Sequence, residues 1–135
     1  MNLEKEELYT HPAVYVNRSS VHRWGVFTTE DIKKNDVIQE SPFCTFPGKD
    51  IKKKADVLWR YVYATAGQDN VDEYVLGFGW ASLYNHDPVH HNCAYELDVI
   101  NQVMRHYATK DIEAGDELLI DYGCGDDFED DDYLR

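Results

Sequence analysis

The sequence predicts a single domain built mostly of β-strands. The chain has 135 residues, which suits one domain with a buried core. Short runs of β-branched and aromatic residues alternate with polar turns, a pattern typical of strands. In addition, residues 29–38 and 109–118 share the form Thr-x-Asp-Ile-x-x-(Asn/Gly)-Asp-x-(Ile/Leu). Because Asn and Gly tolerate a left-handed backbone, each copy is expected to be a strand, a tight turn and a strand that begins at the aliphatic residue.

The N-terminal half contains further strand and loop patterns. We expect strands at 13–16 and 24–28, joined by a polar turn, and a loop at 42–48. Residues 52–66 are ambiguous, because their apolar residues fit a helical stripe but also fit a β-hairpin with residues 74–78.

The C-terminal half is also expected to consist of bends and strands. Gly77-Phe78-Gly79 marks a sharp bend. The elements expected after it are one helical turn at 81–84, a strand pair at 93–99 and 104–108 that turns at Asn101, a last strand at 118–122, and an acidic tail at 126–132. The tail is either a frayed, solvated end or a part of the functional site.

The composition limits the possible partners. Acidic residues outnumber basic ones by 26 to 13, which argues against binding to a nucleic-acid backbone. The excess of acid favours a basic partner or serves solubility alone. Cys44, Cys93 and Cys124 are widely spaced and form no CxxC, so neither a disulfide framework nor a structural zinc is expected. The sequence shows no signal peptide and no run of ~20 apolar residues, which predicts an intracellular protein without membrane contact.

Two stretches carry more polar chemistry than a β-domain needs for its structure. Residues 83–93, Leu-Tyr-Asn-His-Asp-Pro-Val-His-His-Asn-Cys, are dense in amide and imidazole groups. Residues 120–123, Ile-Asp-Tyr-Gly, end an apolar run with a tyrosine between Asp121 and Gly123. We hypothesise that the two stretches meet and that a reaction occurs between them.

These residues resemble the motifs of SET-domain protein-lysine methyltransferases. Three signals fall in the order of that family. Trp24-Gly25-Val26-Phe27 is similar to its glycine-rich opening, residues 77–92 with Asn85-His86 are similar to its asparagine-histidine segment, and residues 108–123 are similar to its last motif, which ends in Asp-Tyr-Gly. The chain looks like the minimal form found in large chlorella viruses, which lacks flanking zinc domains.

The resemblance implies a fold and its boundaries. The expected fold is the SET-domain (β-clip-like) arrangement of several small sheets with short helical turns and a pseudoknot, in which the last segment passes under a loop. The domain core would span about residues 13–123, followed by a tail at 124–135, and the alignment favours a strand at 60–65 over a helix. Arg23 stands where the family usually has Gly, Asp87 stands where it has Ser, and the interval from Asn85 to Asn92 is one residue longer than usual.

The resemblance also implies the chemistry, which is methyl transfer from S-adenosylmethionine to a lysine amine. A free lysine has a pKa near ~10.4, so its amine must lose a proton before it can attack. An aromatic channel and the nearby sulfonium would lower that pKa, and aromatic faces tolerate methylated ammonium. The ten tyrosines of the chain suit such a channel. Tyr122 is assigned the catalytic role, with its hydroxyl beside the methyl group and the amine.

Cofactor and substrate roles follow from the same alignment. Trp24 and Gly25 would offer backbone to the cofactor, Asn85 and His86 would hold it, and Phe128 in the tail would close over the adenine as a lid.

The channel candidates are tyrosines and one aliphatic residue. Tyr61, Tyr63 as its substitute, and Tyr84 could line the lysine channel, although each could equally fill the core. Ile120 stands where the family carries a Phe or Tyr that limits the number of methyl groups, so di- or trimethylation is expected.

The implied partner is a basic protein tail such as a histone, and the viral relatives suggest a homodimer. A eukaryotic or viral protein of this kind would act in the host nucleus, and otherwise in the cytoplasm. Three alternatives stay open. The tyrosines could form the cage of a methyl-lysine reader, the chain could be a SET-like binding protein without activity, or His86, His90, His91 and Cys93 could bind zinc, although their spacing lacks the usual pairing from two separated elements.

Overall fold

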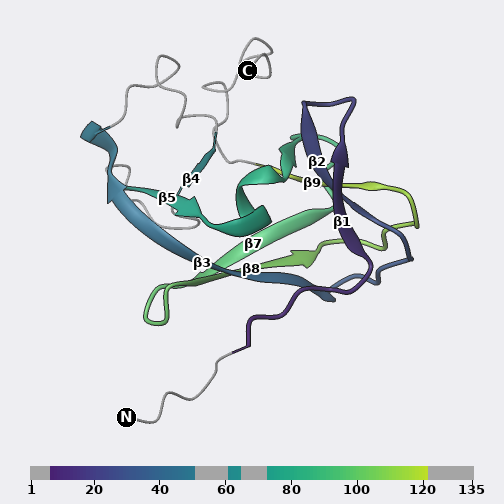
Figure 1. The fold of residues 1–135 in the computed structure, drawn as a ribbon, viewed down its shortest axis with the longest axis horizontal. Helices are drawn as coiled ribbons and strands as arrows, with labels where there is room; N and C mark the ends of the chain where they lie inside the picture. The colour runs from purple at the N-terminus through teal and green to yellow at the C-terminus, as the bar shows by residue number, and fades with distance from the viewer. Residues whose placement is uncertain (1–6, 51–60, 65–72, 122–135) are drawn as a thin grey trace.

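Two β-sheets make up most of the computed structural model, which describes residues 7–50, 61–64 and 73–121 (Figure 1). The four-stranded sheet has the order β1 (Val14–Arg18), β2 (Trp24–Thr28), β9 (Glu117–Ile120) and β6 (Asn85–His86). The five-stranded sheet has the order β4 (Val62–Ala64), β5 (Glu73–Gly77), β3 (Val37–Pro47), β8 (Val103–Ala108) and β7 (Cys93–Asp98). Two 3₁₀ helices, η1 (Gly48–Asp50) and η3 (Gly79–Leu83), complete the described elements. The predicted mostly-β fold with short helical turns is confirmed.

The repeated sequence unit forms a pair of related turns. Ile32 and Ile112 each donate a backbone hydrogen bond to the other, at 2.9 and 2.8 Å. The left-handed position of the first turn is Asn35, with φ 75°, and that of the second is Gly115, with φ 91°. Each turn leads from one strand into the next, from β2 into β3 and from β8 into β9. The prediction of two copies of one strand-turn-strand unit is therefore confirmed.

The strand β3 corrects one expectation. Residues 42–48 were expected to form a loop, but β3 extends through them to Pro47. Pro42 ends the pairing of β3 with β8, and Phe43 begins its pairing with β5. The missing N–H of Pro42 therefore falls where the strand changes partner, and a proline is tolerated at this position.

The ambiguous segment resolves where the structure describes it. Residues 62–64 form β4, which pairs antiparallel with β5, so this part follows the hairpin alternative. The other predicted strands and the helical turn appear within a few residues of their expected bounds, and 24–28 coincides with β2. None of the described helices is long and apolar enough to cross a bilayer.

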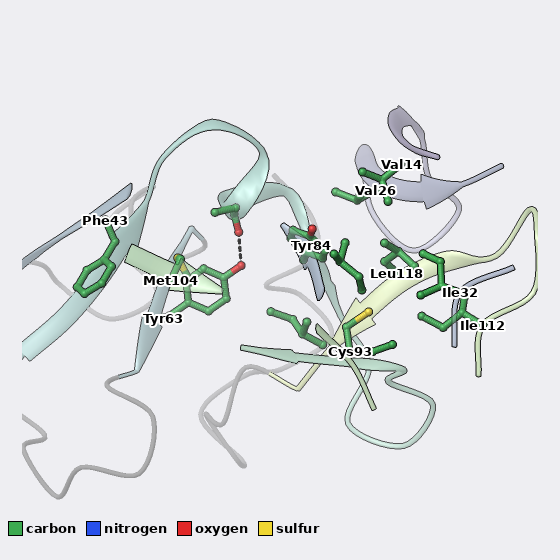
Figure 2. Close-up of a cluster of buried hydrophobic side chains, with 14 of the residues drawn as sticks. Val14, Val26, Ile32, Phe43, Tyr63, Tyr84, Cys93, Met104, Ile112 and Leu118 are labelled. Carbon is green, nitrogen blue, oxygen red and sulfur yellow. Dashed lines mark hydrogen bonds between the residues drawn. The ribbon is translucent and has the colours of Figure 1, made fainter. Parts of the chain in front are cut away.

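The hydrophobic core lies between the two sheets and the turn pair. Val26 of β2, Leu118 of β9 and the two turn isoleucines belong to one buried cluster with Met104 of β8 (Figure 2). On β8 half-buried and fully buried residues alternate, as expected for a strand that faces the core with one side. This packing holds β9, the last of the strands that the structure describes, between β2 and β6.

Candidate active site

The two polar stretches meet at β6 and β9. These strands pair in parallel, with Asn85 opposite Leu119 and His86 opposite Ile120. The amide of Asp87 donates to the carbonyl of Ile120 at 3.0 Å, which continues the contact beyond the strands. The Asn-His segment therefore lies beside the end of the strand that leads into the Asp-Tyr-Gly motif.

His86 contacts the first residue of that motif. Its Nδ1 is 3.9 Å from Oδ1 of Asp121, and its side chain is 5% exposed. Burial lowers the pKa of His86, while the nearby carboxylates of Asp121 and Asp87 oppose that shift. The imidazole is therefore neutral at physiological pH and can both donate and accept a hydrogen bond.

The side chain of Asn85 connects three segments. Its Nδ2 donates to the carbonyl of Trp24 at 2.9 Å and to Oε2 of Glu117 at 2.7 Å, and the same NH₂ group lies 3.2 Å from Oγ of Ser19. Asn85 is almost fully buried, whereas Trp24 is 42% exposed and Gly25 is buried. These contacts join β6 to β9 and to the start of β2.

A pocket of about 150 Å³ brings Trp24 and Tyr61 together, with His22, Arg23 and Leu83 as its other lining residues. Trp24 was predicted to bind the cofactor and Tyr61 to bind the substrate, so two separate predictions meet in one pocket. The guanidinium of Arg18 lies 4.0 Å from the centre of the Trp24 ring and covers one of its faces.

Tyr63 and Tyr84 are buried in the core, at 2% and 0% exposure. The hydroxyl of Tyr63 donates to the carbonyl of Ala81 in η3 (Figure 2). The hydroxyl of Tyr84 donates to Oε1 of Gln39 at 2.8 Å, and its ring stacks on His106 with a centroid distance of 4.0 Å. Burial raises the pKa of Tyr84 well above its ordinary value. Both tyrosines therefore contribute to the packing of the fold, and their place along the lysine channel stays a prediction.

Two departures from the family pattern, Asp87 and the longer interval from Asn85 to Asn92, have local explanations. Oδ1 of Asp87 accepts from the amides of Val89 and His90, at 3.0 and 2.9 Å, and so stabilises the longer turn. Asn92 then rejoins β9, since its Oδ1 accepts from the amide of Leu119 at 2.8 Å and its Nδ2 donates to the carbonyl of Glu117 at 2.9 Å. The extra residue therefore leaves both ends of the loop attached to β9.

The remaining predictions concern Tyr122, Phe128 and a metal site. Tyr122 and Phe128 lie outside the described residues. Across 7–50, 61–64 and 73–121, no group of three or more His, Cys, Asp or Glu side chains could hold a metal ion. A second pocket of about 510 Å³ contains none of the predicted site residues and is lined by Tyr9, His11, Asp36, Val37, Glu40 and Arg105.

Sequence reasoning missed two polar residues of the site, Ser19 and Glu117. Ser19 Oγ donates to Glu117 Oε1 at 2.6 Å, across 98 residues of sequence. The only signal in the sequence was Glu117 itself, a charged residue at the start of an apolar strand. Such a side chain must either reach solvent or form a hydrogen bond within the protein.

The fold and the arrangement of its motifs define a β-domain of the SET type. Residues 23–123 match the family model of the SET domain, and the chain belongs to that family.

Two curated relatives and one solved structure extend the comparison. The histone-lysine N-methyltransferase MEDEA of Arabidopsis thaliana is 27% identical over 124 residues, which cover 87% of this chain and 18% of MEDEA. The H3 lysine-37 specific histone-lysine N-methyltransferase of Schizosaccharomyces pombe is 30% identical over 102 residues, which cover 73% of this chain and 65% of the relative. A crystal structure of a candidate histone methyltransferase from Plasmodium falciparum is similar with a TM-score of 0.63 and 31% identity, over 84% of this chain and 95% of that one. The chain thus spans less than two-thirds of either curated relative.

Proposed function

We propose that this protein is an S-adenosylmethionine-dependent protein-lysine N-methyltransferase that acts on a basic tail, with histones as the substrate class. The observation that carries the proposal is the pairing of Asn85 and His86 with the end of β9, one residue before the motif that contains Tyr122. Membership of the SET family and the two histone-lysine methyltransferase relatives support it.

The residues beside this pairing fit the cofactor. Trp24 has an exposed ring next to the pocket it shares with Tyr61, and His86 is neutral. The carboxylate of Asp121 adds negative charge close to His86, which suits a cationic sulfonium. We assign cofactor binding to Trp24, Gly25, Asn85 and His86, and we retain Phe128 as the proposed lid over the adenine.

S-adenosylmethionine, when bound, supplies an electrophilic methyl group. The protein must orient the lysine amine towards that group after the amine has lost its proton to water. The hydroxyl of Tyr122 is proposed to hold the neutral amine in line, and such positioning accounts for much of the rate of a displacement reaction. Tyr61 is proposed to line the entry of the lysine, since it lies in the same pocket as Trp24.

The substrate class follows from charge. The formal net charge of −13 favours association with a basic tail, because complementary charge raises the rate of encounter. Action on histones would place the protein where chromatin is found. A homodimer remains a proposal, which sedimentation of the purified protein would test.

The direct test is transfer of a labelled methyl group to core histones and to peptide arrays. Tyr122→Phe should reduce the rate constant at least about 100-fold, a loss typical of a group that acts in the transition state. Tyr107→Phe is the matched control, because it removes a hydroxyl from β8 outside the site. A wild-type protein that binds methylated lysine but no S-adenosylmethionine would instead be a reader.

A further inference from the structure

The carboxylate of Glu117 contacts Asn85 of the proposed cofactor site and Ser19 in the turn that leads to Trp24. Oε2 accepts from Nδ2 of Asn85 at 2.7 Å, and Oε1 accepts from Oγ of Ser19 at 2.6 Å. These partners stand 32 and 98 residues away in the sequence. One side chain therefore ties β9 to β6 and to the turn before β2.

Gly25 makes room for this carboxylate. A Cβ atom at Gly25 would lie 2.3 Å from Oε2 of Glu117 and 3.0 Å from Nδ2 of Asn85. A side chain at this position would push the carboxylate of Glu117 out of its observed place and crowd Asn85, so the glycine lets this network pack against the backbone of β2. This requirement is separate from the backbone contact to a cofactor that the sequence suggested.

The contacts of Glu117 also fix the orientation of the Asn85 amide. The carboxylate of Glu117 and the carbonyl of Trp24 are both acceptors, so Asn85 must present its NH₂ group to them. The Oδ1 atom of Asn85 consequently points away from Glu117 and is the group that this side chain offers to a ligand.

Ser19 connects Glu117 to the turn at residues 19–24. Its oxygen accepts from the amides of Val21 and His22, at 3.0 and 3.3 Å, while its hydroxyl donates to Glu117. These bonds shape the turn that leads into Trp24. The position of the pocket lining at His22 and Trp24 therefore depends on where Glu117 holds Ser19.

We propose that Glu117 is a positioning residue of the cofactor site, which orients the amide of Asn85 and holds the turn at residues 19–24 against it. The inference rests on the proposed function, in that the ligand is S-adenosylmethionine. Glu117 acts through Asn85 and Ser19 and does not itself contact the reacting atoms.

The test compares Glu117→Ala, Glu117→Gln and Glu113→Ala. Glutamine can still accept from Asn85 through its carbonyl oxygen and so preserves the amide orientation, although its NH₂ group cannot accept from the Ser19 hydroxyl, whereas alanine loses both bonds. Glu113 is an exposed glutamate on the turn before β9 and is the matched control. S-adenosylmethionine affinity is measured by calorimetry, and the side-chain amide signals of Asn85 are followed by ¹⁵N NMR.

Glu117→Ala should weaken S-adenosylmethionine binding about tenfold or more and shift the Asn85 amide signals, since a hydrogen bond to a charged group is lost. The affinity of Glu117→Gln for S-adenosylmethionine should stay within about threefold of the wild-type value, and that of Glu113→Ala should equal the wild-type value. Wild-type affinity and unchanged Asn85 signals in Glu117→Ala would overturn the proposal, as would an equal loss in Glu117→Gln.

Two further readouts keep the result decisive. If Glu117→Ala does not fold, Ser19→Ala removes only one hydroxyl from the network and should weaken binding about threefold. Wild-type affinity in Ser19→Ala would then contradict the proposal. If the wild-type protein binds no S-adenosylmethionine, the proposed function fails, and the Asn85 signals alone decide whether Glu117 orients the amide.

Discussion

Ile32 and Ile112 exchange two backbone hydrogen bonds and pack their side chains into the same core, at 1% and 2% exposure. The contacts around them are duplicated. Asp111 Oδ1 accepts from the amide of Lys34 at 2.9 Å, and Asp31 Oδ1 accepts from the amide of Ala114 at 2.8 Å. The two sequence copies are thus related by a local two-fold arrangement. The second copy leads from β8 into β9, the strand that pairs with Asn85 and His86.

Replacing either isoleucine should destabilise the protein by a similar amount. We expect Ile32→Ala and Ile112→Ala each to lower the free energy of unfolding by about 2–5 kcal/mol, because each leaves a cavity in the core. Urea denaturation measures the loss. Ile100→Ala is the control, since Ile100 is 93% exposed and should change stability by less than about 0.5 kcal/mol. A loss at only one of the two positions would contradict their equivalence.

Gly115 should tolerate asparagine better than alanine. Its φ of 91° is unfavourable for residues with a Cβ, yet an added Cβ would meet no atom within 4 Å, so the cost is conformational only. Gly115→Ala should therefore destabilise the fold by about 1–2 kcal/mol. Gly115→Asn should cost less, since Asn35 fills the equivalent position. Thermal unfolding compares the variants, and equal stability of all three proteins would refute the explanation.

His106 should make the fold sensitive to acid. It is fully buried, and burial lowers the pKa of His106 from 6.5 to about 3. The folded state thus binds a proton less readily than the unfolded state. The contribution of His106 to the free energy of unfolding is therefore fully present above pH 6.5 and is lost as the pH falls towards 3. The expected slope is about 1.4 kcal/mol per pH unit within that window.

The variant His106→Phe isolates this contribution. Phenylalanine keeps a ring against Tyr84 and removes both ring nitrogens, of which Nδ1 has no hydrogen-bond partner among the described residues and Nε2 lies 3.4 Å from the hydroxyl of Tyr63. Urea denaturation between pH 4 and pH 6 gives the free energy of unfolding at each pH. Its slope against pH should be smaller in the variant by the equivalent of about one bound proton. Identical slopes would mean that His106 does not titrate between the two states.

Ile120 is proposed to permit higher methylation states. Mass spectra of a substrate peptide after prolonged reaction should contain dimethyl or trimethyl product. Ile120→Phe should shift the product towards monomethyl, and its unfolding midpoint must be recorded because Ile120 is fully buried and a larger ring strains the core. Monomethyl product alone from the wild-type protein would refute the proposal.

Local rules predicted part of this molecule well. Asn35 and Gly115 marked the two turns because a positive φ restricts the choice of residue. The loop expected at 42–48 was wrong, because proline excludes a central strand only where its N–H is required, and β3 changes partner at Pro42.

Contacts between distant residues were harder to predict. The sequence left Tyr84 open between the lysine channel and the core, because its neighbour Asn85 lies in the cofactor segment, and the structure buries the ring of Tyr84 against His106. Glu117 was missed because its partners Ser19 and Asn85 become neighbours only after β2, β6 and β9 assemble.

The placement of the cofactor is the central claim, and a ¹⁵N NMR titration with S-adenosylhomocysteine tests it most directly. The shifted signals should concentrate at Trp24, Gly25, Asn85, His86 and Asp121. An absence of shifts, or shifts centred on the pocket at Tyr9, His11 and Arg105, would contradict it.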